Sequence, residues 1–142
     1  MINADILLVL AEGEYSCVGW RNGICYKAAG MGVKPIITPM RENRRFFKGM
    51  QVGDTIIGKA AALLLVLSGV EMVYGKIMSK AAVEVFVKHG VAYQYERLVD
   101  FIQNRQRDGL CPLEQSVLDE DDPEVAWNKI EKKIEELMTG IE

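Results

Sequence analysis

The chain has 142 residues, enough for one compact domain that buries about two thirds of the surface exposed by its unfolded form. Its composition, 49% hydrophobic and 26% charged residues, is typical of a globular protein. A net charge of -3 argues against a nucleic-acid-binding protein, because such proteins usually carry a strongly basic face. Three cysteines without a C-x-x-C pair predict neither a disulfide framework nor a zinc cage.

Two features of the sequence concern the location of the protein. The first residues lack the basic region of a signal peptide and include Asp5. The apolar run 56–70 is shorter than the ~20 residues that a membrane helix needs, and it contains Lys59. We therefore expect a cytoplasmic protein with no membrane partner.

Hydrophobic periodicity and turn residues predict the elements of the first third of the chain. In chain order they are a helix over 2–10, strands over 15–20 and 24–29, and a helix over 36–47. The dipeptide Asn22-Gly23 joins the two strands and is a strong signal for an antiparallel hairpin.

The segment 53–69 has the glycine and lysine spacing of a phosphate-binding P-loop, G-x-x-x-x-G-K-[ST]. Ala60, however, stands where that loop needs a hydroxyl for Mg²⁺, and no convincing strand precedes Gly53. We interpret the segment instead as a helix with Asp54 as its N-cap and Gly69 at its end. Because this helix is apolar on almost every side, we expect it to be central and buried.

The remaining chain predicts a strand over 71–78, a helix over 79–90 with Ser79 as N-cap, a strand over 91–95 and a helix over 96–106. A loop leads to a final amphipathic helix capped by Asp122. This alternation favours an α/β fold with a parallel crossover. Residues 1–118 would form the domain, and 119–142 an acidic linker and a helix packed on it; the stripe with Trp127 either packs there or forms a homo-oligomer contact.

Lys59 has two interpretations. In the first it is structural, reaching water or pairing with a carboxylate such as Asp54, because a lone buried ammonium is costly. In the second, Lys59 and the helix N-terminus face a cleft and bind a phosphate or carboxylate. Gly58 would let a ligand or another backbone approach closely.

Four motifs resemble a known family. They are D-x-x-x-G-K-A-A-A at 54–62, GV-x-x-VY at 69–74, KHG at 88–90 and NR…G-x-CP-x-E at 104–114. The chain is similar over about residues 7–117 to a family of small bacterial and archaeal proteins with a domain of unknown function, placed in the cytidine deaminase-like superfamily. The resemblance implies a three-layer α/β/α sandwich with a mixed sheet.

Zinc deaminases carry H-x-E or C-x-E at one helix start and P-C-x-x-C at the next. The matching positions here, near Asp54 and Ser79, lack histidine and cysteine, so we expect no zinc site, no cofactor and no deaminase reaction. The resemblance suggests that the cleft is kept for a nucleotide- or ADP-ribose-like ligand. The candidate ligand-binding residues are Asp54, Gly58, Lys59, Ser79, Asn104 and Arg105.

The alternative function is a metal-independent enzyme on a nucleotide-like substrate. Asp54 would serve as base or nucleophile, or Cys111 as nucleophile if its thiolate were stabilised. Cys111 has a structural interpretation as well, as a buried small apolar residue. Ser79 likewise has the plainer role of a helix cap.

Overall fold

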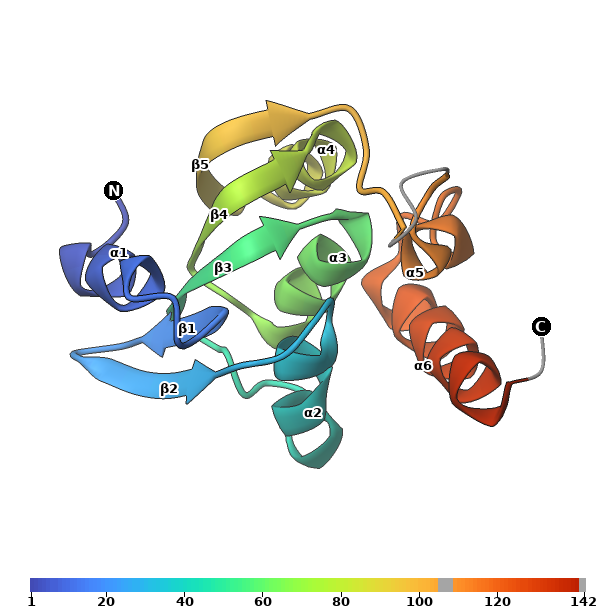
Figure 1. Cartoon of the computed structure of the whole chain (residues 1–142), viewed down its shortest axis with the longest axis horizontal. Helices are drawn as coiled ribbons and strands as arrows, with labels where there is room; N and C mark the ends of the chain where they lie inside the picture. The colour runs from blue at the N-terminus through green and yellow to red at the C-terminus, as the bar shows by residue number, and fades with distance from the viewer. Residues whose placement is uncertain (105–108, 141–142) are drawn as a thin grey trace.

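The computed structural model describes residues 1–104 and 109–140, and their centre is a mixed five-stranded sheet (Figure 1). The strands are β1 (Cys17–Trp20), β2 (Ile24–Ala28), β3 (Gln51–Ile57), β4 (Met72–Ser79) and β5 (Ala92–Val99). They lie in the order β2-β1-β3-β4-β5. β1 is antiparallel to β2 and β3, whereas β3, β4 and β5 run parallel.

In the described part of the chain, six helices connect and cover the strands. They are α1 (Ala4–Ala11), α2 (Lys34–Glu42), α3 (Lys59–Ser68), α4 (Lys80–His89), α5 (Pro112–Ser116) and α6 (Pro123–Thr139). α3 and α4 each connect two neighbouring parallel strands, which need a long connection between them. The predicted alternation of helices and strands, and with it the α/β class, is confirmed.

The hairpin between β1 and β2 forms at the predicted dipeptide. Asn22 has φ 58° and Gly23 has φ 133°, a left-handed turn that glycine and asparagine tolerate best. The pairing slips by one residue between Gly19 and Trp20, which is a β-bulge.

The helices cover both faces of the sheet. Neighbouring residues of a strand point to opposite faces, and the hydrophobic clusters follow this rule in β4, where Val73 belongs to one cluster and Tyr74 to the other. α1 packs in the smaller cluster through Ile6. Gly53 makes this possible, because a Cβ there would overlap the Ile6 side chain. The first glycine of the P-loop-like spacing therefore serves the packing of α1.

The larger cluster contains the central helix. Residues 60–65 of α3 are at most 4% exposed, which confirms the predicted buried helix. Ala126, Trp127 and Ile130 of α6 belong to this same cluster. The apolar stripe of the C-terminal helix is therefore buried against its own chain.

Three predicted helices differ from the structure. The helix predicted from Asp54 begins only at Lys59, because residues 54–57 pair with β4 as the end of β3. The helix predicted over 96–106 does not form in the described part of that range, since β5 continues to Val99 beside β4. α2 also ends at Glu42, shortly after Pro39, rather than at residue 47. Among the described residues, no helix is both long and apolar enough to span a membrane.

Candidate functional site

The N-terminus of α3 holds a buried carboxylate that comes from elsewhere in the chain. Glu114 of α5 accepts hydrogen bonds from the backbone N–H groups of Lys59, at 2.7 Å, and of Ala60, also at 2.7 Å. The N-cap residue Gly58 supplies no side chain for this purpose. Glu114 therefore satisfies two of the N–H groups that every helix leaves open at its start, and its negative charge matches the positive end of the helix dipole.

Gly58 is required by this arrangement for reasons of space. A Cβ at residue 58 would lie 2.5 Å from Oε1 of Glu114. The backbone of Gly58, with φ -102° and ψ -171°, is extended and accessible to any residue. The glycine thus provides room for the carboxylate rather than an unusual conformation.

Glu114 is only 7% exposed, and burial raises its pKa above the ordinary value. The N–H groups of Ala60 and Lys59 and the charge of Lys59 oppose that rise. The motifs G-K-A and C-P-x-E, which lie 55 residues apart, are consequently two halves of one contact. We name this contact, made of Gly58, Lys59, Ala60 and Glu114, the α3 clamp.

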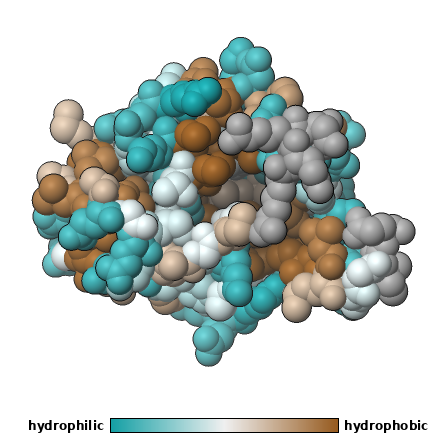
Figure 2. Space-filling model, in the orientation of Figure 1, coloured by the Kyte–Doolittle hydropathy of each residue, from teal (hydrophilic) through white to brown (hydrophobic). Residues whose placement is uncertain are grey.

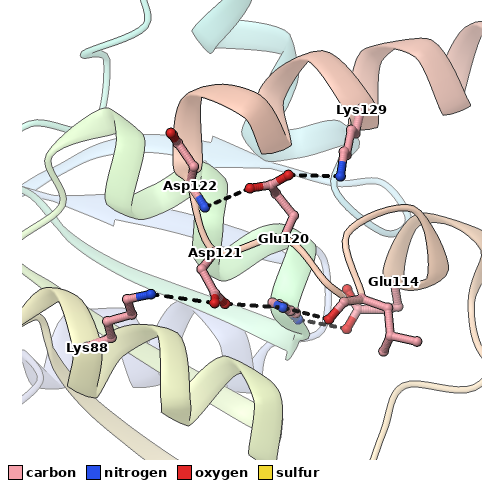
Figure 3. A network of polar contacts seen from close by, with 8 residues as sticks. Lys88, Glu114, Glu120, Asp121, Asp122 and Lys129 are labelled. Atoms are coloured by element: carbon pink, nitrogen blue, oxygen red, sulfur yellow. Dashed lines mark hydrogen bonds and ion pairs between the residues drawn. The ribbon is translucent and has the colours of Figure 1, made fainter.

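The Lys59 ammonium extends the α3 clamp toward α6. It donates a hydrogen bond to the carbonyl of Leu118 at 2.8 Å and lies 3.6 Å from Asp121. Asp121 also lies 3.5 Å from Lys88 of α4, as Figure 3 shows. The expected pairing of Lys59 with Asp54 is wrong, because Asp54 belongs to β3 and the partner carboxylate comes from the acidic linker.

Neighbouring contacts fix the same linker. Glu120 pairs with Lys129 of α6 at 2.8 Å and accepts the N–H of Asp122 at 3.1 Å (Figure 3). Asp122 caps α6 as predicted, accepting the N–H of Glu124 at 2.9 Å. The acidic run is therefore a set of helix caps and ion pairs that join α3, α4 and α6.

Asp54 is a buried carboxyl group with a strongly raised pKa. It is 3% exposed, and lies opposite Cys17 in the pairing of β3 with β1. Its Oδ1 accepts the N–H of Ile56 at 3.3 Å, whereas its Oδ2 is buried without a hydrogen-bond partner among the described residues. Burial raises the pKa of Asp54 to about 7, against the opposing hydrogen bonds from Ile56 and Thr55. The prediction that Asp54 caps a helix is wrong.

Two further candidates have defined local contacts. Ser79 is buried and caps α4 as predicted, accepting the N–H of Ala82 at 3.1 Å. Cys111 is half-buried directly before α5, and its N–H donates to the carbonyl of Ile102 at 3.0 Å. Arg105 lies outside the described residues. In the described part of the chain, no three His, Cys, Asp or Glu side chains lie close enough to hold a metal ion.

A groove of about 450 Å³ lies at the carboxyl ends of the three parallel strands. It is lined by Ile56, Ile77, Arg97, Val99, Asp100, Phe101, Ile102, Gln103 and Asn104. Figure 2 shows brown hydrophobic side chains in a hollow near the middle of the molecule. The groove therefore combines an apolar lining with a few polar groups.

Sequence reasoning identified only one residue of this groove, Asn104. Arg97, Val99, Phe101 and Ile102 were missed because the sequence predicts a helix over residues 96–106. Once β5 runs to Val99, its end lies beside the ends of β3 and β4. In open α/β sheets, ligands usually bind at the carboxyl ends of the strands. A correct C-terminal boundary for β5 would therefore have predicted the location of this groove.

The fold and the contacts now define an α/β protein with a mixed five-stranded sheet and a carboxylate-capped central helix. Residues 5–134 match the TM1506 family, described as a domain of unknown function (DUF1893), and the chain belongs to this family. No protein in the curated comparison matches the chain.

The chain is also similar to a solved structure, the crystal structure of a DUF1893 family protein (TM1506) from Thermotoga maritima at 2.70 Å resolution. The identity is 23%, the match covers 94% of this chain and 92% of the other, and the TM-score is 0.83. At this identity the similarity shows that the two chains share a fold.

Proposed function

We propose that the protein binds a small anionic ligand of nucleotide-like chemistry in the groove at the carboxyl ends of β3, β4 and β5. The observation that carries this proposal is the lining of the groove. Arg97, an exposed residue of β5, lines the groove together with apolar residues that include Ile56 and Ile77. A guanidinium next to an apolar surface suits a ligand with a phosphate or carboxylate and a flat ring.

The proposed location differs in part from the one expected from the sequence. In one of the two interpretations of Lys59, the N-terminus of the central helix binds an anionic ligand; in the structure this end of α3 binds the carboxylate of Glu114. A ligand at that position would have to displace a carboxylate held by two 2.7 Å hydrogen bonds. We therefore assign the ligand to the neighbouring groove, with Asn104 retained from the predicted set and Arg97 added.

The wider relationship is part of the same proposal. We place the fold with the three-layer α/β/α sandwiches of the cytidine deaminase-like superfamily, as the sequence motifs suggest. What supports this is the cover of helices on both faces of a mixed sheet. Under this relationship the ligand-binding region would be retained without zinc chemistry.

The second candidate function, a metal-independent enzyme, has one observation in its favour. An acid with a pKa of about 7 is suited to proton transfer, and Asp54 has such a pKa. At 3% exposure, however, its carboxyl is closed to any substrate in this conformation. Cys111 is more accessible, but the chain's one histidine, His89, lies at the far end of α4. Binding is therefore the function that we favour.

The test is a binding panel. Wild type should be stabilised in thermal-shift and calorimetric measurements by one or more of nucleoside mono- and diphosphates, ADP-ribose and inorganic phosphate. Arg97→Gln should weaken that binding roughly 10- to 100-fold, the loss expected for a charge-assisted hydrogen bond. Lys132→Gln, which removes one positive charge from the exposed side of α6, is the matched control and should leave the affinity unchanged.

Two results would contradict the proposal. One is the absence of binding by every compound of the panel. The other is equal weakening by Arg97→Gln and Lys132→Gln, which would indicate a general effect of charge rather than a site at the groove.

A further inference from the structure

β5 is an edge strand with an open side. It pairs with β4 alone, and no other described segment pairs with it. Ala92 and residues 95–98 are exposed, including the large side chains of Tyr95 at 39% and Leu98 at 38%. The strand therefore offers eight residues of backbone for pairing.

Several usual protections of an edge strand are missing from β5, although it carries the charged residues Glu96 and Arg97. Proteins commonly block such edges with lysine, proline, a bulge or a very short strand. β5 has the sequence AYQYERLV, which contains no lysine, proline or glycine, and its register with β4 is regular. The opposite edge strand, β2, is shorter, carries Lys27 and contains a bulge at Cys25.

We propose that β5 pairs antiparallel with β5 of a second copy of this chain, with the two-fold axis at Tyr95. A two-fold axis perpendicular to an antiparallel ladder places one residue opposite its own copy. The residue on the axis fixes the register of the two strands, and the register decides which side chains face one another. The charges of β5 therefore indicate which residue lies on the axis.

The axis at Tyr95 gives complementary pairs on both faces. It places Arg97 opposite the second copy's Tyr93, whose ring already stacks between Phe86 and Tyr95 at centroid distances of 6.1 and 6.5 Å. Because both faces of that ring are covered, the guanidinium would reach the phenolic oxygen of Tyr93, which can accept a hydrogen bond. The pairing would bring an aromatic ring to the edge of the groove that Arg97 lines.

On the other face, the same axis places Gln94 opposite Glu96 of the second copy. The Oε1 atom of Gln94 already accepts the N–H of Ile2, at 3.4 Å, which leaves its amide N–H groups as donors. Oε2 of Glu96 accepts the hydroxyl of Tyr74, which leaves Oε1 as acceptor. The unused groups of the two side chains are therefore complementary.

The neighbouring registers are less favourable. An axis at Glu96 would oppose two carboxylates, and an axis at Arg97 would oppose two guanidinium groups, both of which destabilise a ladder. An axis at Gln94 would leave Glu96 and Arg97 opposite apolar residues. Only the axis at Tyr95 pairs both charged residues with suitable partners.

The first test is the mass in solution. Size-exclusion chromatography with light scattering should give twice the 15.9 kDa of the chain for wild type at micromolar concentrations. Tyr95→Lys, which would place two ammonium groups together at the axis, should give the mass of one chain with an unchanged circular dichroism spectrum. A monomeric wild type, or a folded Tyr95→Lys variant that stays dimeric, would overturn the proposal.

The second test examines the register by crosslinking, in a Cys25→Ser, Cys111→Ser background. Two Tyr95→Cys residues at the axis would have Cα atoms about 4.5–5.5 Å apart, within reach of a disulfide. Leu98→Cys is the matched control, equally exposed but ~20 Å from its copy in this register. Mild oxidation should crosslink the first variant and not the second. Equal crosslinking of the two, or none with Tyr95→Cys, would overturn the proposed register.

Discussion

At the scale of single residues, the buried ionisable groups Lys59 and Asp54 differ in how their charge is compensated. The Lys59 ammonium keeps a carbonyl and a carboxylate as partners, so its charge is compensated where it lies. Asp54 has weak hydrogen bonds on one oxygen and none among the described residues on the other. Its pKa of about 7 means that the carboxyl is largely protonated, and therefore neutral, below neutral pH.

This difference predicts how stability depends on pH. The unfolded chain has an Asp54 pKa near 3.8 and the folded chain one of about 7. Between these values the folded state binds the proton and the unfolded state does not, so the free energy of unfolding falls as pH rises from about 4 to about 7. The fall reaches up to about 4 kcal/mol on this account.

Asp54→Asn should remove that part of the slope. Urea unfolding of both proteins at intervals from pH 4 to pH 8 measures the difference, and the variant should become the more stable protein above about pH 7. Glu114, whose pKa is also raised, is present in both proteins and drops out of the comparison. Parallel curves for the two proteins would show that Asp54 is ionised throughout.

At the scale of elements, the sequence predicted types better than boundaries. The β-branched residues Thr55, Ile56 and Ile57 favour a strand, but a good cap residue before a long apolar run favoured a helix, and pairing with β4 decides between them. Residues 96–99 contain helix-forming Glu, Arg and Leu, and the same kind of pairing overrides that preference. Pairing between distant strands is not visible in local sequence.

The α3 clamp shows the same limit at the candidate site. One of the two interpretations of Lys59 placed an anion at the N-terminus of the central helix, and a carboxylate of the same chain is found there. That this carboxylate comes from Glu114 of α5 is not visible in the local sequence around Gly58. Local patterns identify open N–H groups, but the partner 55 residues away requires the fold.

A double-mutant cycle should reveal this contact. Gly58→Ala should lower the free energy of unfolding by about 1–3 kcal/mol, because the new methyl overlaps the carboxylate of Glu114. In a Glu114→Ala background the overlap is gone, and the cost should fall below about 1 kcal/mol. Glu114→Gln keeps the size of the side chain, so there the cost of Gly58→Ala should persist. Additive losses in the alanine background would contradict the arrangement.

At the scale of the whole molecule, one hydrophobic cluster joins the central helix α3 to α4 and to the C-terminal helix α6. It contains α3, residues of α4, and Ala126, Trp127 and Ile130 of α6. The C-terminal helix should therefore unfold together with the sheet rather than as a separate unit.

Two substitutions in α6 test this dependence. Ile130→Ala should cost about 2–5 kcal/mol, since Ile130 is fully buried, and should lower the hydrogen-exchange protection of α3 and α6 together. Leu137→Ala, at 39% exposure on the same helix, should change stability by less than about 0.5 kcal/mol. Loss of protection confined to α6 would show that the helix opens independently.

The sequence separation across the α3 clamp has a consequence for synthesis of the protein. A chain that grows at roughly 5–20 residues per second receives Glu114 about 3 to 11 s after Lys59. All five strands of the described sheet precede Glu114 in the chain, so the sheet can begin to assemble on the ribosome before this residue is added. Until then, the open N–H groups at the start of α3 can form hydrogen bonds only with water. Glu114 then binds the open N–H groups of α3, and Leu118 and Asp121, which are added later still, complete the contacts of Lys59.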